Sequence, residues 1–444
     1  MSTSRGLNRL QIRNPRNDRF ARSARIALNG FELTSPYFFS LAQNVEEASC
    51  LREIALPDAH IGGCIVRIFD APTIVGTRRS NYQTTFDSQM EFSEKESRKY
   101  KQTFPIVIDP ATEYLYYRKH MPKWAALTNL PESLRKYLAR CRSDLKYKKS
   151  EQKRLRKQHW QLWNQQIADH PDLEHELIGY FFDTELAFES ATLLPPVPIV
   201  DSELDLETTF EMNRLALMDA TGRNAEQGNY FIVQPSMIES EHIRNLLVDF
   251  VANSPVRLNV FKFKYMSLRG AGAGLLDGFA ALYERLAQVR EQQPQKVFMV
   301  LENGEQVFPS AAVCFDFVSS SMTGFDFDRG GKSEGKGGLW DYRKKVNIKI
   351  DAVERAYRNN DNKPSCNHSV CQSVSPITAS LGVWYKIRRQ HYVFTMDDFM
   401  ADLARYVSEA NIEQARRDLI NSHLSVLREL VPTNWGHPAM PVPP

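Results

Sequence analysis

Two cysteines and two histidines near the carboxyl end of the chain have the residue types and spacing of a zinc site. Three of them fall within a six-residue stretch and the fourth follows about twenty positions later: Cys366, His368, Cys371 and His391. Two thiolates and two imidazoles complete the tetrahedron that Zn²⁺ prefers, and four protein ligands leave no position for a catalytic water. The pattern predicts a structural zinc ion, the alternative being two free thiols beside two surface histidines.

The same spacing resembles the zinc site of a known family. Cys-x-His-x-x-Cys with a distant His is similar to the Cys-x-Cys-x-x-Cys and later His of the tRNA-guanine transglycosylases, with His368 replacing the middle cysteine. Three other segments resemble family motifs and follow the family's order. They are Phe31–Phe39 (Thr-Pro-x-Phe, with Ser35 for the threonine), Ile232–Gln234 with Ile243-Arg244 (Ile-Val-Gln-Gly), and Gly324–Asp328 (Gly-x-Asp-x-Phe-Asp).

This resemblance implies base exchange in a nucleic acid. In that family an aspartate attacks C1′ of a guanosine nucleotide, guanine leaves, and a 7-deazaguanine base takes its place. A carboxylate is a competent nucleophile at an anomeric carbon, and a covalent intermediate divides the exchange into two displacements. Asp328 is the expected nucleophile, and Asp326 stays a contender because the segment is one residue shorter than the family's.

A second carboxylate is expected to carry the proton of the leaving and entering bases. Asp109 ends the apolar run 104–109, which resembles the strand before the family's Asp-Ser-Gly-Gly motif. Proton transfer is needed because an unprotonated guanine anion is a poor leaving group. Pro110 follows Asp109 in place of the glycines. A turn-forming Asp-Pro at the end of a strand is therefore the structural alternative.

Four more residues are expected to recognise the substrate. Gln234 offers a donor and an acceptor to a flat heterocycle, and Asp201 matches the approximate position of the family's base-reading aspartate. A buried carboxylate left without its partner costs free energy, which is how such a pocket rejects adenine. Lys262 and Lys264 stand where the family has Gly-Gly-Leu, which favours a different polymer contact. Strand-end Gln and Asp residues can also simply satisfy backbone groups.

Eight short apolar or β-branched runs predict the elements that position these residues. Helical periodicity separates several of them, as at 241–250 and 276–289, and the alternation predicts an α/β fold, a (β/α)8 TIM barrel. Catalytic groups of such a barrel lie at the carboxyl ends of its strands. The runs are 31–40, 64–70, 104–109, 192–200, 230–235, 257–263, 296–302 and 323–328.

The expected domain organisation places the barrel in the middle of the chain. A basic N-terminal arm covers 1–23, and the catalytic barrel covers 24–355 with a helical basic insertion at 121–180. A zinc-binding and C-terminal helical segment covers 356–430, and 431–444 is a proline-rich tail. With 444 residues, 42% of them hydrophobic, the chain is long enough to bury a core of this size.

Positive charge is concentrated in two segments. The net charge is only +3, yet residues 1–25 hold seven arginines against Asp18, and residues 135–157 hold eleven Lys or Arg against two acids. Both segments fit a polyanion partner, with a disordered tail and a solvated helix as the alternatives. The sequence shows no secretory segment and no apolar run near twenty residues, which predicts a cytoplasmic protein with no membrane partner.

Together these patterns favour an enzyme that modifies DNA. Missing Gly-Gly elements and added basic segments favour the divergent DpdA-like branch of the superfamily, which inserts a 7-deazaguanine such as 7-cyano-7-deazaguanine into DNA. A duplex target would have to be flipped out of the helix. One alternative is base exchange in tRNA. The other is a non-catalytic, zinc-containing, nucleic-acid-binding partner subunit, and partner proteins are compatible with each of these readings.

Overall fold

The computed structural model describes two compact units of the chain, one formed by 1–9, 41–45 and 65–232 and the other by 10–40, 46–64 and 233–444. Within them the described residues are 11–17, 22–28, 30–35, 37–42, 61–67, 105–110, 191–223, 227–263, 273–301, 327–329, 339–341 and 346–348, with seven helical positions between 387 and 401. The boundary between them falls within three strands, β4 (Tyr37–Ala42), β5 (Ile61–Arg67) and β9 (Asn229–Val233).

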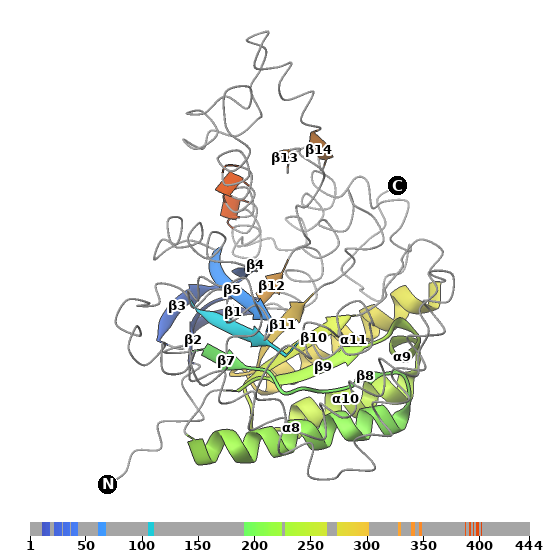
Figure 1. Ribbon diagram of the computed structural model, residues 1–444. Coiled ribbons are helices and arrows are strands. Elements are labelled where there is room, and N and C mark those ends of the chain that lie inside the picture. Colours follow the sequence, from blue (N-terminus) through green and yellow to red (C-terminus); the bar gives the residue numbers. More distant parts are fainter. Residues whose placement is uncertain are drawn as a thin grey trace, which may run out of the picture. The chain divides into compact units, whose positions relative to one another are not determined.

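Four neighbouring strands that lie wholly or mainly in the second unit run parallel. Their order is β4, β12 (Phe327–Arg329), β11 (Val297–Leu301) and β10 (Leu258–Phe263), and β5 lies on the other side of β4 (Figure 1). Every residue of β10 and β11 is buried. Such continuous burial is typical of parallel strands that are covered on both faces, which explains their nearly unbroken apolar sequences.

The predicted first strand, 31–40, is divided in the structure. Phe31–Thr34 forms β3, which pairs antiparallel with β2 (Arg22–Leu28), and β2 pairs antiparallel with β1 (Gln11–Asn17). The residues after Pro36 join the parallel sheet as β4 instead. A proline has no backbone N–H and cannot donate to a ladder, so a change of sheet at this position has a chemical reason. The arm predicted at 1–23 thus includes β1 and the start of β2.

Strands β2 and β3 form a tight hairpin with one buried face. Leu28 pairs with Phe31, and Gly30 between them has φ of 84°, a conformation that suits glycine. Along β2 the side chains alternate: Ala24, Ile26 and Leu28 are buried. This period of two is expected of a sheet that packs on the core with one face and meets solvent with the other.

Hydrogen bonds and a close approach at a glycine connect three helices of the second unit. Helices α9 (Pro235–Glu239), α10 (Glu241–Asn253) and α11 (Ala273–Gln292) pack against one another. The Ser240 hydroxyl accepts from the Ile243 N–H at 3.4 Å and caps α10, and the Arg244 guanidinium donates to the Ile238 carbonyl at 2.6 Å. Gly278 allows the close approach of α11, since a Cβ there would lie 2.5 Å from that same carbonyl oxygen.

The Lys296 side chain caps the carboxyl end of α10. Its Nζ donates to the carbonyls of Val251 at 2.8 Å and Val256 at 3.0 Å, and also to that of Ser254. Burial lowers the pKa of Lys296 to about 8, so the ammonium is still charged at neutral pH. A cation with three donors suits this position because the last carbonyls of a helix have no partners within the helix and carry partial negative charge.

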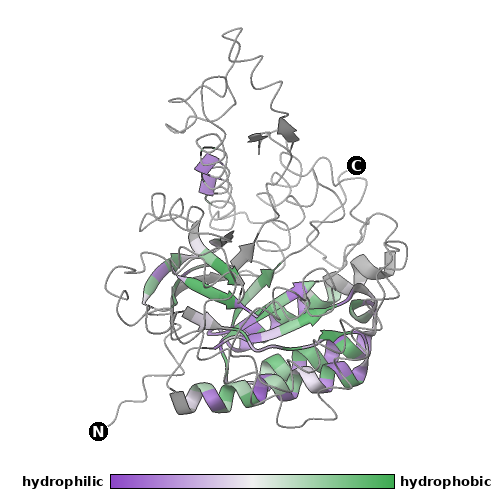
Figure 2. Cartoon of the chain, viewed as in Figure 1, coloured by the Kyte–Doolittle hydropathy of each residue, from purple (hydrophilic) through white to green (hydrophobic). Residues whose placement is uncertain are grey.

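The first unit holds other strands and the longest described helix. Strand β6 (Ile106–Asp109) lies parallel to β7 (Ala191–Leu193), and β8 (Ile199–Val200) neighbours β9. Helix α8 (Glu203–Arg223) packs on β8 and carries mixed purple and green turns in Figure 2. Within the described part of the chain, no helix is both long and apolar enough to cross a membrane.

The predicted elements agree with the described ones in position. Each of the eight predicted runs overlaps at least one strand, and 241–250 and 276–289 lie within α10 and α11. Beyond these, the structure adds the antiparallel pair β13 (Leu339–Asp341) and β14 (Val346–Ile348). Parallel strands accompanied by helices are features of α/β folds, and the (β/α)8 barrel stays a prediction of the sequence. The insertion predicted at 121–180 and the tail at 431–444 lie outside the described residues.

Candidate functional site

A buried carboxylate and a buried phenol meet in the first unit. Asp109, the residue predicted to transfer protons, ends β6 and is 1% exposed. The hydroxyl of Tyr230, on β9, donates to Asp109 Oδ1 at 3.0 Å. Because β6 and β9 are not neighbours in the sheet, the two side chains must project to the same face to touch. A buried carboxylate is costly without such a hydrogen bond, so Tyr230 stabilises Asp109 in this position.

The backbone of Tyr230 is held in turn by an amide from α8. Asn213 accepts from the Tyr230 N–H at 2.8 Å and donates to the Tyr230 carbonyl at 3.0 Å. Its second Nδ2 hydrogen bond, to the Thr209 carbonyl at 2.8 Å, fixes the amide on the helix. The Asn213 side chain is 1% exposed, and it pairs with a backbone N–H and a backbone carbonyl of β9 as the backbone of a neighbouring strand does. Asn213 and Tyr230 therefore form a continuous support for Asp109.

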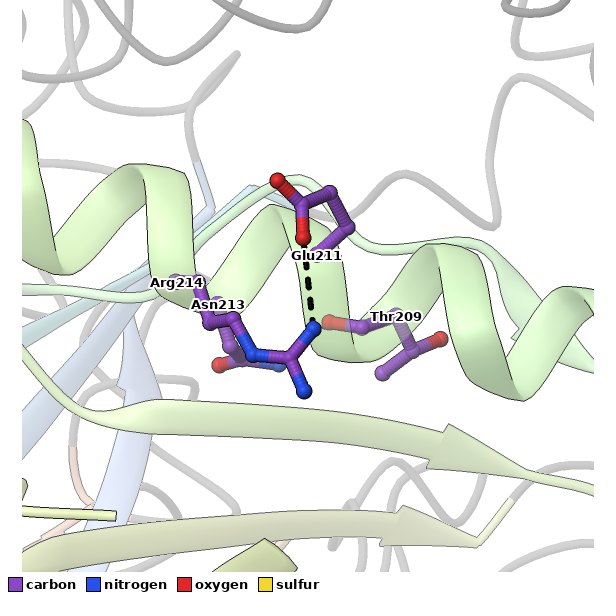
Figure 3. A network of polar contacts seen from close by, with 4 residues as sticks. All are labelled: Thr209, Glu211, Asn213 and Arg214. Atoms are coloured by element: carbon purple, nitrogen blue, oxygen red, sulfur yellow. Dashed lines mark hydrogen bonds and ion pairs between the residues drawn. The ribbon is translucent and has the colours of Figure 1, made fainter.

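Helix α8 also carries an exposed ion pair. Figure 3 shows Thr209, Glu211, Asn213 and Arg214 along the helix, with the Glu211–Arg214 pair dashed. Its N to O distance is 3.2 Å, and the side chains of Arg214 and Glu211 are 61% and 50% exposed respectively. Exposed pairs of this kind contribute about 0–1 kcal/mol because water screens them. The chemically informative contacts of α8 are therefore the buried ones.

Asp201, predicted to read the base, follows β8 immediately before α8. Its backbone N–H donates to Asp205 Oδ2 at 3.1 Å. Ser202 donates its hydroxyl to that same oxygen at 2.8 Å and accepts from the Asp205 N–H at 3.2 Å, which is a reciprocal helix cap. The cap fixes the backbone of Asp201, whose side chain is half-buried.

Gln234 follows β9 at the N-terminus of α9. Its side chain is half-buried, and its carbonyl accepts from the Met237 and Ile238 N–H groups. Among the residues that the structure describes, its side-chain amide makes no capping hydrogen bond to α9. The donor and acceptor that the sequence assigned to base recognition are therefore not used to begin the helix.

Lys262 and Asp328 lie on the two strands that flank β11. Lys262 is level with Leu301, and Asp328 is level with Val300 and, on its other side, with Phe38. Lys262 is 0% exposed, so a nucleic acid could reach it only by inserting a nucleotide into the interior. The backbone of Asp328 lies in a short strand bonded on both sides. Asp326 and Lys264 lie outside the described residues.

One of the four predicted zinc ligands is described. His391 lies in a helical segment and is 2% exposed, so it is a buried rather than a surface histidine. Cys366, His368 and Cys371 lie outside the described residues. Within the part of the chain that is described, no three His, Cys, Asp or Glu side chains gather as a metal site. The zinc site stays a prediction of the sequence.

Comparison of the chain with known protein families and with curated proteins finds no match. The resemblance to the transglycosylases therefore rests on the quoted motifs. Of the predicted site residues, the structure joins Asp109 to a partner that the sequence did not identify, Tyr230, and through it to Asn213.

Proposed function

We propose that the chain exchanges guanine in DNA for a 7-deazaguanine base such as 7-cyano-7-deazaguanine, through a covalent aspartyl-nucleotide intermediate. The observation that carries the proposal is Asp109 itself, a carboxylate buried at the carboxyl end of a parallel strand and held by a phenol. Strand carboxyl ends are where α/β enzymes place their catalytic groups. The motif resemblance supplies the reaction.

In this proposal two aspartates divide the chemistry. The Asp328 carboxylate bonds to C1′ as the bond from C1′ to guanine N9 breaks, and the electron pair leaves with the base, which takes a proton from the carboxyl group of Asp109 and leaves Asp109 as a carboxylate. The entering base then loses its N9 proton to Asp109 and displaces Asp328 from C1′. The hydrogen bond from Tyr230 holds the Asp109 carboxylate in place for this transfer.

The proposed architecture is the (β/α)8 barrel. Support comes from β12 and β4, the last and the first strands of the parallel set, which are paired directly and in parallel. A sheet whose order simply followed the chain would leave these two strands at opposite edges. In a ring of parallel strands the first strand lies beside the last, so this pairing supports the proposal, although the described sheet has two ends, β7 and β8.

Substrate recognition in this proposal uses polar groups that are buried or half-buried. Gln234 and Asp201 read the base edge, and Lys262 meets a nucleotide that has been flipped out of its duplex, since its burial excludes a contact with an intact helix. Zinc held by Cys366, His368, Cys371 and His391 stabilises the C-terminal segment, and the burial of His391 suits an imidazole ligand.

Covalent trapping tests the reaction. The full-length protein is incubated with labelled guanine-containing DNA or tRNA, and adducts are compared for Asp328→Ala, Asp326→Ala and Asp109→Ala. We expect an adduct on DNA that survives Asp326→Ala and disappears in Asp328→Ala. Adducts on tRNA alone would move the substrate to tRNA, and none on either nucleic acid would favour the non-catalytic partner subunit.

A metal measurement tests the zinc site separately. We expect one zinc per chain, lost in Cys366→Ser and retained in Cys64→Ser, because Cys64 is a buried cysteine of β5 and no part of the predicted site. Chelation should lower the melting temperature, since a structural zinc contributes directly to folding. A chain that purifies without zinc and is indifferent to chelators would exclude this assignment.

A further inference from the structure

The antiparallel sheet β1-β2-β3 has a face that the proposed reaction does not use. Its buried face carries Ala24, Ile26, Leu28 and Leu33. On the opposite face of β2 and β3, Arg25 and Glu32 are exposed and Thr34 is partly exposed. This solvent face belongs to the segment in which the sequence concentrates arginines.

The strand register gathers three arginine positions on that face. Arg13 of β1 is directly opposite Arg25 of β2, and Thr34 of β3 is opposite Arg25 on the other side. After an irregularity in β1, Arg16 is opposite Ser23, which is two residues from Arg25 and so on the same face. We define the positions of Arg13, Arg16 and Arg25 as the arginine face.

This arrangement opposes the stability of the free sheet. Like charges directly opposite each other on neighbouring strands are destabilising. The described positions of this face include three arginines and one acid, Glu32, so positive charge is in excess. Arginines at opposite positions suit a phosphate, because a guanidinium binds it with paired N–H donors. A bound polyanion would thus remove a repulsion that folding alone has to tolerate.

We propose that the arginine face binds the phosphate backbone of the nucleic acid, apart from the base-exchange chemistry. This inference rests on the proposed function only for the class of partner. A nucleic acid is favoured over an anionic membrane because the described positions of this face offer no large apolar side chain for insertion among lipids. Antiparallel strands also dock readily along duplex grooves. Contacts of this kind position a substrate and read no sequence.

Binding to guanine-free DNA tests the proposal without involving base exchange. The full-length protein is titrated with a labelled duplex of A·T pairs at increasing salt, and fluorescence anisotropy gives the affinity. Replacing Arg13, Arg16 and Arg25 together by Gln should weaken binding and lower the slope of log K against log salt by about 0.9 for each phosphate that the protein no longer neutralises. Arg25→Lys keeps the charge and should keep most of the slope.

Arg214→Gln is the matched control, because Arg214 is an exposed arginine of α8 that is paired with Glu211. It should leave the salt slope unchanged. The triple variant should melt no lower than the wild type, since it removes like charges at opposite positions of neighbouring strands.

An unchanged slope in the triple variant would overturn the proposal, as would a wild type that binds anionic vesicles but not DNA. Arginine-dependent DNA binding without any covalent adduct would instead refute the base exchange and leave the arginine face standing.

Discussion

The support of Tyr230 by Asn213 gives the sharpest test of the structure. Asn213→Ala removes one buried amide that makes two hydrogen bonds to the Tyr230 backbone and one to Thr209. Asn253→Ala is a natural control. Asn253 donates to the Asp249 carbonyl at 2.8 Å, four residues back in α10, just as Asn213 does to Thr209 in α8, but Asn253 is exposed.

The expected magnitude follows from the groups left behind. Without Asn213, the N–H and the carbonyl of Tyr230 both lose this partner at a residue that is 0% exposed. Each buried polar group left unsatisfied costs roughly 1–3 kcal/mol, so the pair should lower the free energy of unfolding by about 2–6 kcal/mol. Asn253→Ala leaves an exposed carbonyl that water can reach. It should change the stability by about 0.5 kcal/mol or less.

Urea denaturation of both variants, followed by far-UV circular dichroism, measures this difference. If the two alanine substitutions destabilise the protein equally, the amide does not hold the strand as the structure indicates. A second readout concerns the site. Because Tyr230 positions Asp109, Asn213→Ala should also slow adduct turnover in the trapping assay, whereas Asn253→Ala should leave it unchanged.

Three further substitutions test other contacts. Tyr230→Phe should lower the free energy of unfolding by about 1–3 kcal/mol, because it removes the phenol hydroxyl that donates to Asp109. A double-mutant cycle with Asp109→Asn should show that the two effects are coupled. If the two effects simply add, the hydrogen bond between these side chains does not stabilise the protein. Because the folded-state pKa of Lys296 is about 8 and the ordinary value is 10.5, the unfolded chain holds more protons in that window. As the pH rises from about 8 to 10.5, the wild type should therefore gain stability relative to Lys296→Met. A decrease in the urea midpoint of the wild type relative to that of the variant over this range would contradict the lowered pKa of Lys296. Gly63→Ala should lower the melting temperature because its Cβ would collide with the ring of Phe39, and Phe39→Leu should restore part of the loss; without such rescue the clash is not the cause.

The strands that overlap the eight predicted runs were predictable because each belongs to a short apolar run. In β10 and β11, burial on both faces demands apolar residues at almost every position, and the sequence displays this directly. Helix α10 was predictable from its periodicity, and it begins directly after Ser240, a good capping residue. The break between β3 and β4 had a visible signal in Pro36, since a proline within a run interrupts pairing.

The supporting residues of the site were not predictable from the sequence. Asn213 lies in the interior of a helix, where asparagine is unremarkable, and its partner Tyr230 is 17 positions away with nothing local to connect them. Strand β1 was not predicted from the sequence, for a different reason. Its sequence contains asparagines and a proline, residues depleted from strands, and its pairing depends on the alternating pattern of β2 rather than on its own.

The parallel pairing of β4 with β12 has a consequence for synthesis of the protein on the ribosome. About 285 residues separate the end of β4 from the start of β12. Because translation adds about 5–20 residues per second, β12 is synthesised roughly 15 to 60 seconds after β4. During that interval the nascent chain exposes an edge that other chains can join. Overproduction should therefore be sensitive to translation rate and to chaperones that shield strands as they emerge.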